Sequence, residues 1–572
     1  MNSNNIIVQE YLSSLKEDKE LDYLFPILLS SMGYRIVQTA KEAKGQSQYG
    51  KDIIAIRENE YGVKCRWYFE LKGYADKDIT DTNYSKKDGI RESILEAKDT
   101  AFNDSSIAGF NTLPIKIVLV HNGVIKANIR PTFDGLIARE FKEGEFERWD
   151  IYYLTDLFSQ FLFSEYLLAD IESSRLFKRT LAFLDTPGYD YTDFQALVTL
   201  QFEKSNFVKK RAFSKLFATL NLLESIVFHY SKQNNNLIAA KECSKFLVLK
   251  TWSWILKNKL ENREPVLKEF RKLLHIQYQI FDSYFKKTFP VARIANGLFA
   301  ENGLFFENFG YPLRCFEYLE DAIYYCQLRG FYPEFKTSST QFKKLKNKQK
   351  DLVIELINNN SGFTRPILDN QSIIIMQLFL FFAEENYLRQ KDVNFIGSYV
   401  FKVLENIVVS KIRHNRLPEL YSRIDIVAET IATNKKAQEY TDTSSILLTT
   451  LLELLVIFDS QESYDEVLKF MDEKLSYQIA YPNYKEYDIE QLLFEKNMHR
   501  EYYVECLQEK LGDFNEFKKV VQANPKTPIT FRTDQSGFFF LRHLAHSYFK
   551  NELIPDEWRK YIKVDEEPVC SL

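Results

Sequence analysis

The uneven distribution of glycine constrains the fold of this chain more than any other feature of its sequence. Ten of the 19 glycines lie in residues 1–170, and nine are spread over the remaining 402 residues. Because glycine terminates helices and permits tight turns, the first segment is expected to contain short, often interrupted elements. The rest is expected to form long helices. We place the division between Asp170 and the turn-forming stretch Asp185-Thr186-Pro187-Gly188.

Residues 1–170 alternate between helical and strand-like patterns, which predicts a small α/β sandwich. Gly33 is suited to end the first helix in a left-handed cap. The run IKIVLV is continuously apolar, as expected of a strand buried on both faces. The expected elements are, in order, a helix, a strand hairpin, a helix, two strands and a final helix: Leu21–Met32, Asp52–Ile56 with Val63–Leu71, Gly89–Phe102, Ile115–Val120 and Ile151–Leu154, and Asp156–Leu168.

Residues 185–572 show the helical period almost throughout, which predicts a large all-α region. One apolar stripe has the i, i+3, i+4, i+7 spacing of a buried helix face; it consists of Phe213, Leu216, Phe217, Leu220, Leu223 and Val227. No fixed repeat of 34 or about 40 residues is evident, so we expect an irregular helical array. A polar stretch over 336–372 is expected to subdivide it, and Asn524–Gly537 is a second candidate break.

The composition is that of a protein without a membrane anchor. Two windows, Ile373–Ala383 and Ile446–Phe458, are strongly apolar, but both are shorter than the ~20 residues of a spanning helix. We therefore interpret both as buried core helices and expect a cytoplasmic protein. The six cysteines are scattered without a CxxC pair, so neither a zinc ribbon nor a disulfide framework is indicated.

Two acidic residues and a lysine form the most informative pattern. If the hairpin is symmetric about Tyr61, Asp52 lies directly opposite Glu70, and opposed residues have Cβ atoms ~4.5–5.5 Å apart. Two carboxylates at that separation can share one cation. Lys72 lies two residues after Glu70 and therefore projects from the same face of the strand. Mg²⁺ held by few carboxylates keeps several waters and can activate one for attack on phosphorus, and a neighbouring lysine can orient that water.

This arrangement resembles the PD-(D/E)xK nucleases, and specifically the Mrr-type restriction endonuclease branch. The resemblance covers residues 15–160 and rests on the helix ending in Gly33-Tyr34, the GxD at Asp52 and the ExK at Glu70 and Lys72. It implies a restriction-endonuclease-like fold in which Asp52 and Glu70 bind Mg²⁺, or Mn²⁺ in its place, and Lys72 is catalytic. It also makes Asp22 a candidate outer metal ligand, although the usual acid at that position is Glu.

The resemblance implies a DNA endonuclease that functions in prokaryotic restriction or anti-phage defence. The helical region would then sense a trigger, bind a partner protein or drive homo-oligomer formation. Lys41, Lys44 and Lys51 are the candidate contacts to the nucleic-acid backbone, although residues 1–170 carry 21 Lys and Arg against 27 Asp and Glu. This net −6 opposes DNA binding by the first domain alone. Two alternatives stay open: RNA cleavage by the same chemistry, and a helical scaffold whose nuclease-like domain only binds.

Four weaker patterns favour structural interpretations. Gly45–Asp52 fits GxxxxGK, but Asp replaces the Ser or Thr that a phosphate-binding loop requires, and a strand-like run follows. His543 and His546 lie one helical turn apart without an apparent third metal ligand, so we expect a packed helix. His121 follows a strand, where a histidine usually forms a hydrogen bond. The basic run Phe342–Lys350 is expected to be a solvated helix face.

Overall fold

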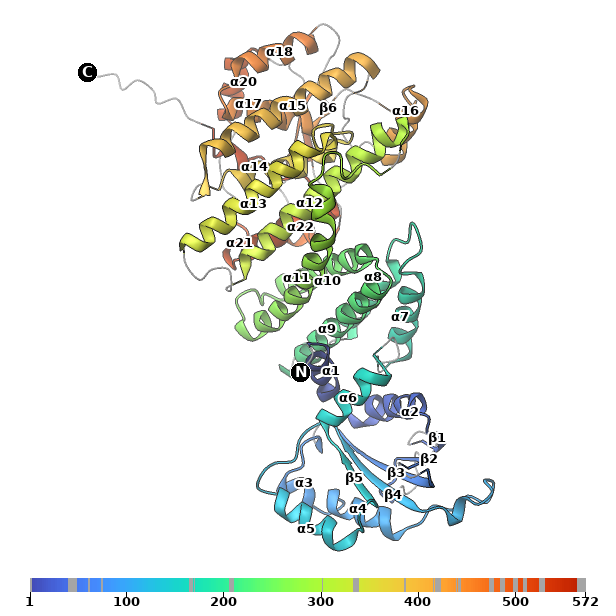
Figure 1. The fold of residues 1–572 in the computed structure, drawn as a ribbon. Helices are drawn as coiled ribbons and strands as arrows, with labels where there is room; N and C mark the ends of the chain where they lie inside the picture. Colours follow the sequence, from blue (N-terminus) through green and yellow to red (C-terminus); the bar gives the residue numbers. More distant parts are fainter. Residues whose placement is uncertain are drawn as a thin grey trace, which may run out of the picture. The chain divides into compact units, whose positions relative to one another are not determined.

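The computed structural model (Figure 1) describes most of the chain. The described residues are 3–39, 49–59, 62–73, 76–163, 168, 170–204, 210–300, 302–332, 339–384, 387–414, 416, 423–438, 440, 444–472, 478–483, 489–496, 503–507, 512–523 and 530–562. The chain forms two compact units. Unit 1 comprises Met1–Leu247 and Pro265–Gln277, and unit 2 comprises Val248–Glu264 and Tyr278–Leu572.

Unit 1 contains a mixed five-stranded sheet with the order β1-β2-β3-β4-β5. The first three strands are antiparallel neighbours, whereas β3, β4 and β5 run parallel. The parallel strands are joined through helices, as a parallel connection requires. The strands are β1 (Arg35–Gln38), β2 (Ile53–Glu58), β3 (Lys64–Lys72), β4 (Ile115–His121) and β5 (Phe146–Trp149). The predicted mixture of helices and strands in the N-terminal part is confirmed.

Helices cover both faces of this sheet (Figure 1). On one face Phe25 of α2 (Asp22–Ser31) packs edge-on against Phe69 and Trp149, with ring centroids 5.3 and 5.9 Å apart. On the other face Tyr68 belongs to a cluster that includes Ala97 of α4 (Ile90–Asp99). The helices α3 (Asp81–Ser85) and α5 (Arg130–Glu140) pack on this second face. β3 is therefore buried on both sides.

The predictions for this part of the chain are wrong at one element and incomplete at several others. Ile151–Leu154 is not a strand, because Asp150 caps a helix there by accepting from the N–H groups of Tyr152 and Tyr153; the helix is α6 (Ile151–Phe161). The true edge strand, β5, lies just before it. Further elements were not predicted, namely α1 (Ser3–Ser14), β1 and the helices over Asp81–Ser85 and Arg130–Glu140. A π-helical turn, η1 (Glu17–Leu21), follows α1.

The remainder of unit 1 is helical. It consists of α7 (Ile171–Phe183), α8 (Thr192–Lys204), α9 (Lys210–Gln233) and parts of α10 (Leu237–Lys257) and α11 (Glu264–Ala292). α1 packs against α6 and α9. Contacts of this kind join the N-terminal segment to the helical part of the same unit.

Unit 2 is mostly helical. Its larger elements are α12 (Tyr311–Phe331), α13 (Ser339–Asn359), α14 (Ser372–Phe382), α15 (Gln390–His414), α16 (Ile424–Thr433), α17 (Ile446–Ile457), α18 (Gln461–Asp472), α20 (Phe514–Ala523) and α22 (Phe539–Phe549). The all-α prediction is wrong in one respect, because β6 (Ser444–Ser445), β7 (Gln478–Asn483) and β8 (Tyr503–Leu507) form a small sheet. Strands of two to six residues are too short to interrupt a helical periodicity visibly.

The apolar windows of unit 2 form core helices, as predicted. Every residue of α17 except Ile457 is buried, and ten of the eleven residues of α14 are buried. In the described part of the chain, α15 alone combines the length and apolar character of a membrane-spanning helix, a combination that core helices also show.

Candidate functional site

The turn before β2 sets the position of Asp52. Tyr49 and Gly50 both have positive φ, 46° and 68°. A Cβ on Gly50 would lie 2.0 Å from the carbonyl oxygen of Ser93 in α4, so only glycine fits there. The chain therefore passes directly beside α4 and enters β2 one residue after Asp52.

The register of the hairpin over its paired residues is the predicted one, and Asp52 lies one residue before the first pair. Ile53 pairs with Phe69 and Ile54 with Tyr68, and the ladder between β2 and β3 ends at Ile53. The N–H of Asp52 donates to the Phe69 carbonyl at 2.9 Å, and Asp52 Oδ2 accepts from the N–H of Leu71 at 2.7 Å. The Asp52 side chain therefore lies against the end of β3, close enough to Glu70 for the two carboxylates to repel each other.

Lys72 lies beside both this pair and a third carboxylate. Its Nζ lies 2.6 Å from Glu70 Oε1 and 3.8 Å from Glu17 Oε1. The side chains of Glu70 and Lys72 are 6% and 15% exposed, whereas that of Glu17 is 39% exposed. The other oxygen of Glu17 accepts from the N–H of Gly73 at 3.2 Å. One lysine therefore faces several acids at the carboxyl end of β3.

Burial and mutual repulsion shape the electrostatics of this cluster. Burial raises the pKa of Asp52 well above its usual value, and the neighbouring Glu70 raises it further. Burial also raises the pKa of Glu17, while Lys72 opposes this shift. Burial alone would lower the pKa of Lys72, but Glu70, Glu17 and Asp52 together raise it. Lys72 is therefore an ammonium ion at neutral pH.

The acid that the N-terminal helices bring to Lys72 is Glu17, which the sequence analysis missed. Asp22, the residue expected there, is half-buried at the start of α2. One signal could have revealed α1, the helix directly before Glu17. Val8, Tyr11, Leu12 and Leu15 have the i, i+3, i+4, i+7 spacing and are all buried. The approach of Glu17 to β3 is a tertiary contact without a local pattern.

The three lysines proposed as backbone contacts have different outcomes. Lys51 is buried, at 4% exposure, and donates to the carbonyls of Tyr49 at 2.9 Å and Glu96 at 3.4 Å. Burial lowers its pKa to about 8. In this structure Lys51 is therefore turned toward α4 and not toward solvent. Lys41 and Lys44 lie outside the described residues.

His121 is the parallel neighbour of Lys72 on β4. It is fully buried, and its Nδ1 lies 2.9 Å from the carbonyl oxygen of Lys77. Burial lowers its pKa to about 4, so the ring is neutral at pH 7. The hydrogen bond expected of a histidine at a strand end is confirmed.

The remaining candidates are structural. His543 and His546 are buried, as expected of a packed helix. His543 is hydrogen-bonded to the Gln327 side chain at 3.0 Å, and His546 to the Asn551 carbonyl at 2.8 Å. The phosphate-loop interpretation fails as predicted, since β2 and not a helix follows Lys51; residues 45–48 lie outside the described part.

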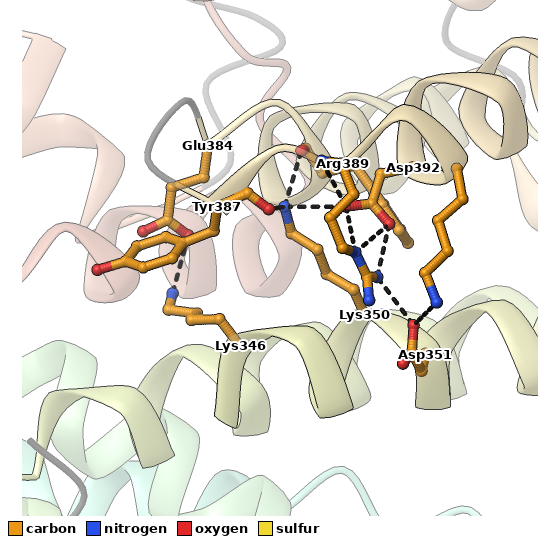
Figure 2. A network of polar contacts seen from close by, with 9 residues as sticks. Lys346, Lys350, Asp351, Glu384, Tyr387, Arg389 and Asp392 are labelled. Atoms are coloured by element: carbon orange, nitrogen blue, oxygen red, sulfur yellow. Dashed lines mark hydrogen bonds and ion pairs between the residues drawn. The ribbon is translucent and has the colours of Figure 1, made fainter. Parts of the chain in front are cut away.

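The basic run on α13 is only partly a solvated face. Lys343, Lys344 and Lys348 are exposed, but Lys346 and Lys350 are buried. Figure 2 shows these two lysines directed at the chain between α14 and α15, where Lys346 pairs with Glu384 at 2.9 Å. Lys350 donates to two backbone carbonyls and lies 3.6 Å from Asp392. The prediction is wrong for these two, since their partners are distant in sequence.

Asp52 and Glu70 fit the expected metal on chemical grounds. Both offer carboxylate oxygens, the donors that Mg²⁺ and Mn²⁺ prefer. Burial first and repulsion by Glu70 second raise the pKa of Asp52, and a shared cation would offset both effects. Within the described residues no three His, Cys, Asp or Glu side chains converge as a complete metal site. Water and substrate oxygens would therefore have to complete the coordination.

No protein-family model, no curated protein and no solved structure matches this chain. The function must therefore be argued from the residues of the site.

Proposed function

We propose that this protein is a Mg²⁺-dependent endonuclease that hydrolyses phosphodiester bonds in DNA. The observation that carries the proposal is the convergence of Asp52, Glu70 and Lys72 at the ends of two paired strands. The sheet that holds them is mixed and covered by helices on both faces. This context agrees with the resemblance to the Mrr-type PD-(D/E)xK nucleases.

Each residue has a distinct task in this proposal. Asp52 and Glu70 would hold the cation, which supplies Lewis acidity toward a phosphoryl oxygen and a more acidic bound water. The Leu71 N–H fixes one oxygen of Asp52 and so orients its carboxylate. Lys72, as an ammonium ion, would donate to a phosphate oxygen and offset the negative charge that develops on it.

Binding of DNA requires a contribution from outside the first 170 residues. Their net charge of −6 repels a polyanion, and Lys51 is buried. We propose that the helical region or assembly into a homo-oligomer supplies the positive surface. Control of cleavage by that region agrees with a restriction or anti-phage effector, which is the biological role we propose.

One observation favours the alternative of a binding-only domain. Lys72 and Glu70 satisfy each other at 2.6 Å, so the cluster is stable as a purely structural ion pair. In that case the domain needs no cation, and the protein is a helical scaffold.

Cleavage of supercoiled plasmid, phage DNA and single-stranded RNA, with Mg²⁺, Mn²⁺ or EDTA, tests the proposal. Asp52→Ala, Glu70→Gln and Lys72→Met are expected to lose at least 100-fold in rate. Glu58 and Lys64 pair at the opposite end of the same ladder, so Glu58→Gln and Lys64→Met are matched controls that should retain activity. Cleavage that survives all three site substitutions refutes the assignment. Cleavage of RNA and not of DNA would show that RNA is the substrate.

A further inference from the structure

The segment Ser3–Leu21, made of α1 and η1, contacts both the carboxyl ends of the central strands and the helices of unit 1. Val8, Tyr11, Leu12 and Leu15 are buried, and α1 packs against α6 and α9. Because Glu17 belongs to this segment, its position depends on both sets of contacts.

Side chains from the segments that follow β3 and β4 hold the C-terminus of α1. The Asn122 amide donates to the carbonyls of Leu12 at 2.7 Å and Leu15 at 2.9 Å. Lys77 Nζ donates to the carbonyl of Ser13 at 2.9 Å. The last carbonyls of a helix lack partners within it, so these bonds fix α1 to the edge of the sheet beside Lys72.

Glu17 then lies directly against the backbone that follows Lys72. A Cβ on Gly73 would lie 2.7 Å from the Glu17 nitrogen, closer than real contacts allow. The Gly73 N–H donates to Glu17 Oε2 at 3.2 Å, and Glu17 Oε1 lies 3.8 Å from Lys72 Nζ. A small displacement of η1 therefore removes a carboxylate from Lys72.

Two ion pairs hold the same segment from the helical side. Lys272 Nζ lies 2.6 Å from Glu10 Oε1, and Lys215 of α9 pairs with Glu20 Oε1. Glu20 Oε2 also accepts from the N–H of Lys16 at 2.7 Å, at the start of η1. All four charged side chains are partly exposed, and such pairs contribute little. This contact is therefore easily broken by a molecule that binds the helices.

The π-helical form of η1 makes it sensitive to that contact. The Leu21 N–H donates to the Lys16 carbonyl at 2.9 Å, the five-residue spacing of a π-turn. Single π-turns are rare and occur frequently at functional sites. Glu20, which Lys215 holds, lies within this turn.

We propose that Ser3–Leu21 is the connection through which α9 and α11 regulate the proposed active centre. While Lys215 and Lys272 hold the segment, Glu17 lies against Gly73 and positions the Lys72 ammonium. When these pairs break, Glu17 withdraws and Lys72 is left with Glu70. The regulated activity rests on the proposed function, whereas the structural connection does not depend on it.

Hydrogen exchange of the Gly73 amide in the full-length protein, read at single-residue resolution, tests the connection without cleavage. Glu17→Ala removes the acceptor and is expected to speed exchange about tenfold. Lys215→Met is expected to speed exchange of the Gly73 amide about fivefold. Lys215→Arg keeps the charge and should leave exchange unchanged. Lys204→Met, which breaks the pair between Lys204 and Asp170 elsewhere in unit 1, is the matched control.

The Trp67 amide, in the middle of β3, reports whether a variant has lost its fold. If Lys215→Met speeds Trp67 exchange as well, Lys272→Met is the independent variant with the same expected effect on Gly73. Fast Gly73 exchange in Glu17→Ala, with wild-type exchange in the Lys215 and Lys272 variants, overturns the proposal. Wild-type exchange in Glu17→Ala also overturns the proposal, because the Gly73 N–H then does not depend on Glu17.

Kinetics of DNA cleavage on the same proteins separates this inference from the proposed function. Because a fivefold rise in exchange, against tenfold for complete loss of the contact, leaves about half of the molecules with Glu17 in place, kcat is expected to fall about twofold in Lys215→Met and further in Glu17→Ala, with KM unchanged. If the wild-type protein cleaves nothing and the exchange differences are observed, the proposed nuclease activity is refuted and the connection is supported. If Asp52→Ala abolishes cleavage but exchange is unaltered in Lys215→Met, the connection is refuted and the proposed nuclease activity is supported.

Discussion

Substitution of Gly73 by alanine tests the close approach of η1 to β3 most directly. The added methyl group would lie 2.7 Å from the Glu17 nitrogen, 3.1 Å from its Cα and 3.2 Å from the Lys16 carbonyl carbon. Ordinary contacts begin near 3.4 Å, so the segment must retreat by about 0.7 Å. All three atoms belong to the backbone and cannot turn aside. Overpacking of this kind costs ~1–3 kcal/mol.

The control for this prediction is Gly135→Ala in α5. A Cβ on Gly135 meets nothing within 4 Å, and glycine in a helix interior is less favourable than alanine by ~0.5–1 kcal/mol. Gly135→Ala should therefore be neutral or stabilising. Exchange of the β3 amides reports opening of unit 1 and should be about 5- to 150-fold faster in Gly73→Ala. Equal exchange in the two variants would refute the packing described for Gly73.

Three further predictions concern buried ionisable groups. Lys350→Met leaves two backbone carbonyls without their donor and should destabilise unit 2 by ~2–4 kcal/mol in urea unfolding, whereas exposed Lys343→Met should change less than ~0.5 kcal/mol. His121 has a pKa of about 4 in the folded protein, so the unfolded chain binds a proton first as the pH falls. The free energy of unfolding is therefore fully retained above pH ~6.5 and decreases as the pH falls toward 4. That loss is roughly 3 kcal/mol, and His121→Asn should remove this pH dependence of unfolding. Asp52→Asn should abolish cleavage without loss of stability at pH 7, because it removes the cost of burying the carboxylate and its repulsion with Glu70; lower stability would show that the charge of Asp52 supports the fold.

The sequence predicted those parts of the site that depend on local pairing. Asp52, Glu70 and Lys72 lie on one hairpin, and a period of two with a symmetric register was sufficient to place them together. The helix that ends at Gly33 and the strand Ile115–His121 were also recognisable, because their apolar patterns are long and uninterrupted.

The parts that the sequence did not predict depend on distant contacts or on short elements. β5 has only four residues, two of which are Glu147 and Arg148, so no apolar pattern marks it. The apolar and aromatic residues that follow were read as a strand, but Asp150 caps them as a helix. Glu17 reaches Gly73 across 56 residues, and no local spacing indicates such a contact.

The docking of α1 onto later helices also affects how the protein is synthesised. Glu10 pairs with Lys272, which leaves the ribosome 262 residues later. At ~5–20 residues per second, roughly 10–50 s separate the two. Asn122 and Lys215 also follow α1, so the nascent chain carries the apolar face of α1 uncovered for most of that interval. The carboxylate of Glu17 reaches its final position only after the helices of unit 1 have been made, and the centre at Lys72 is therefore completed late in translation.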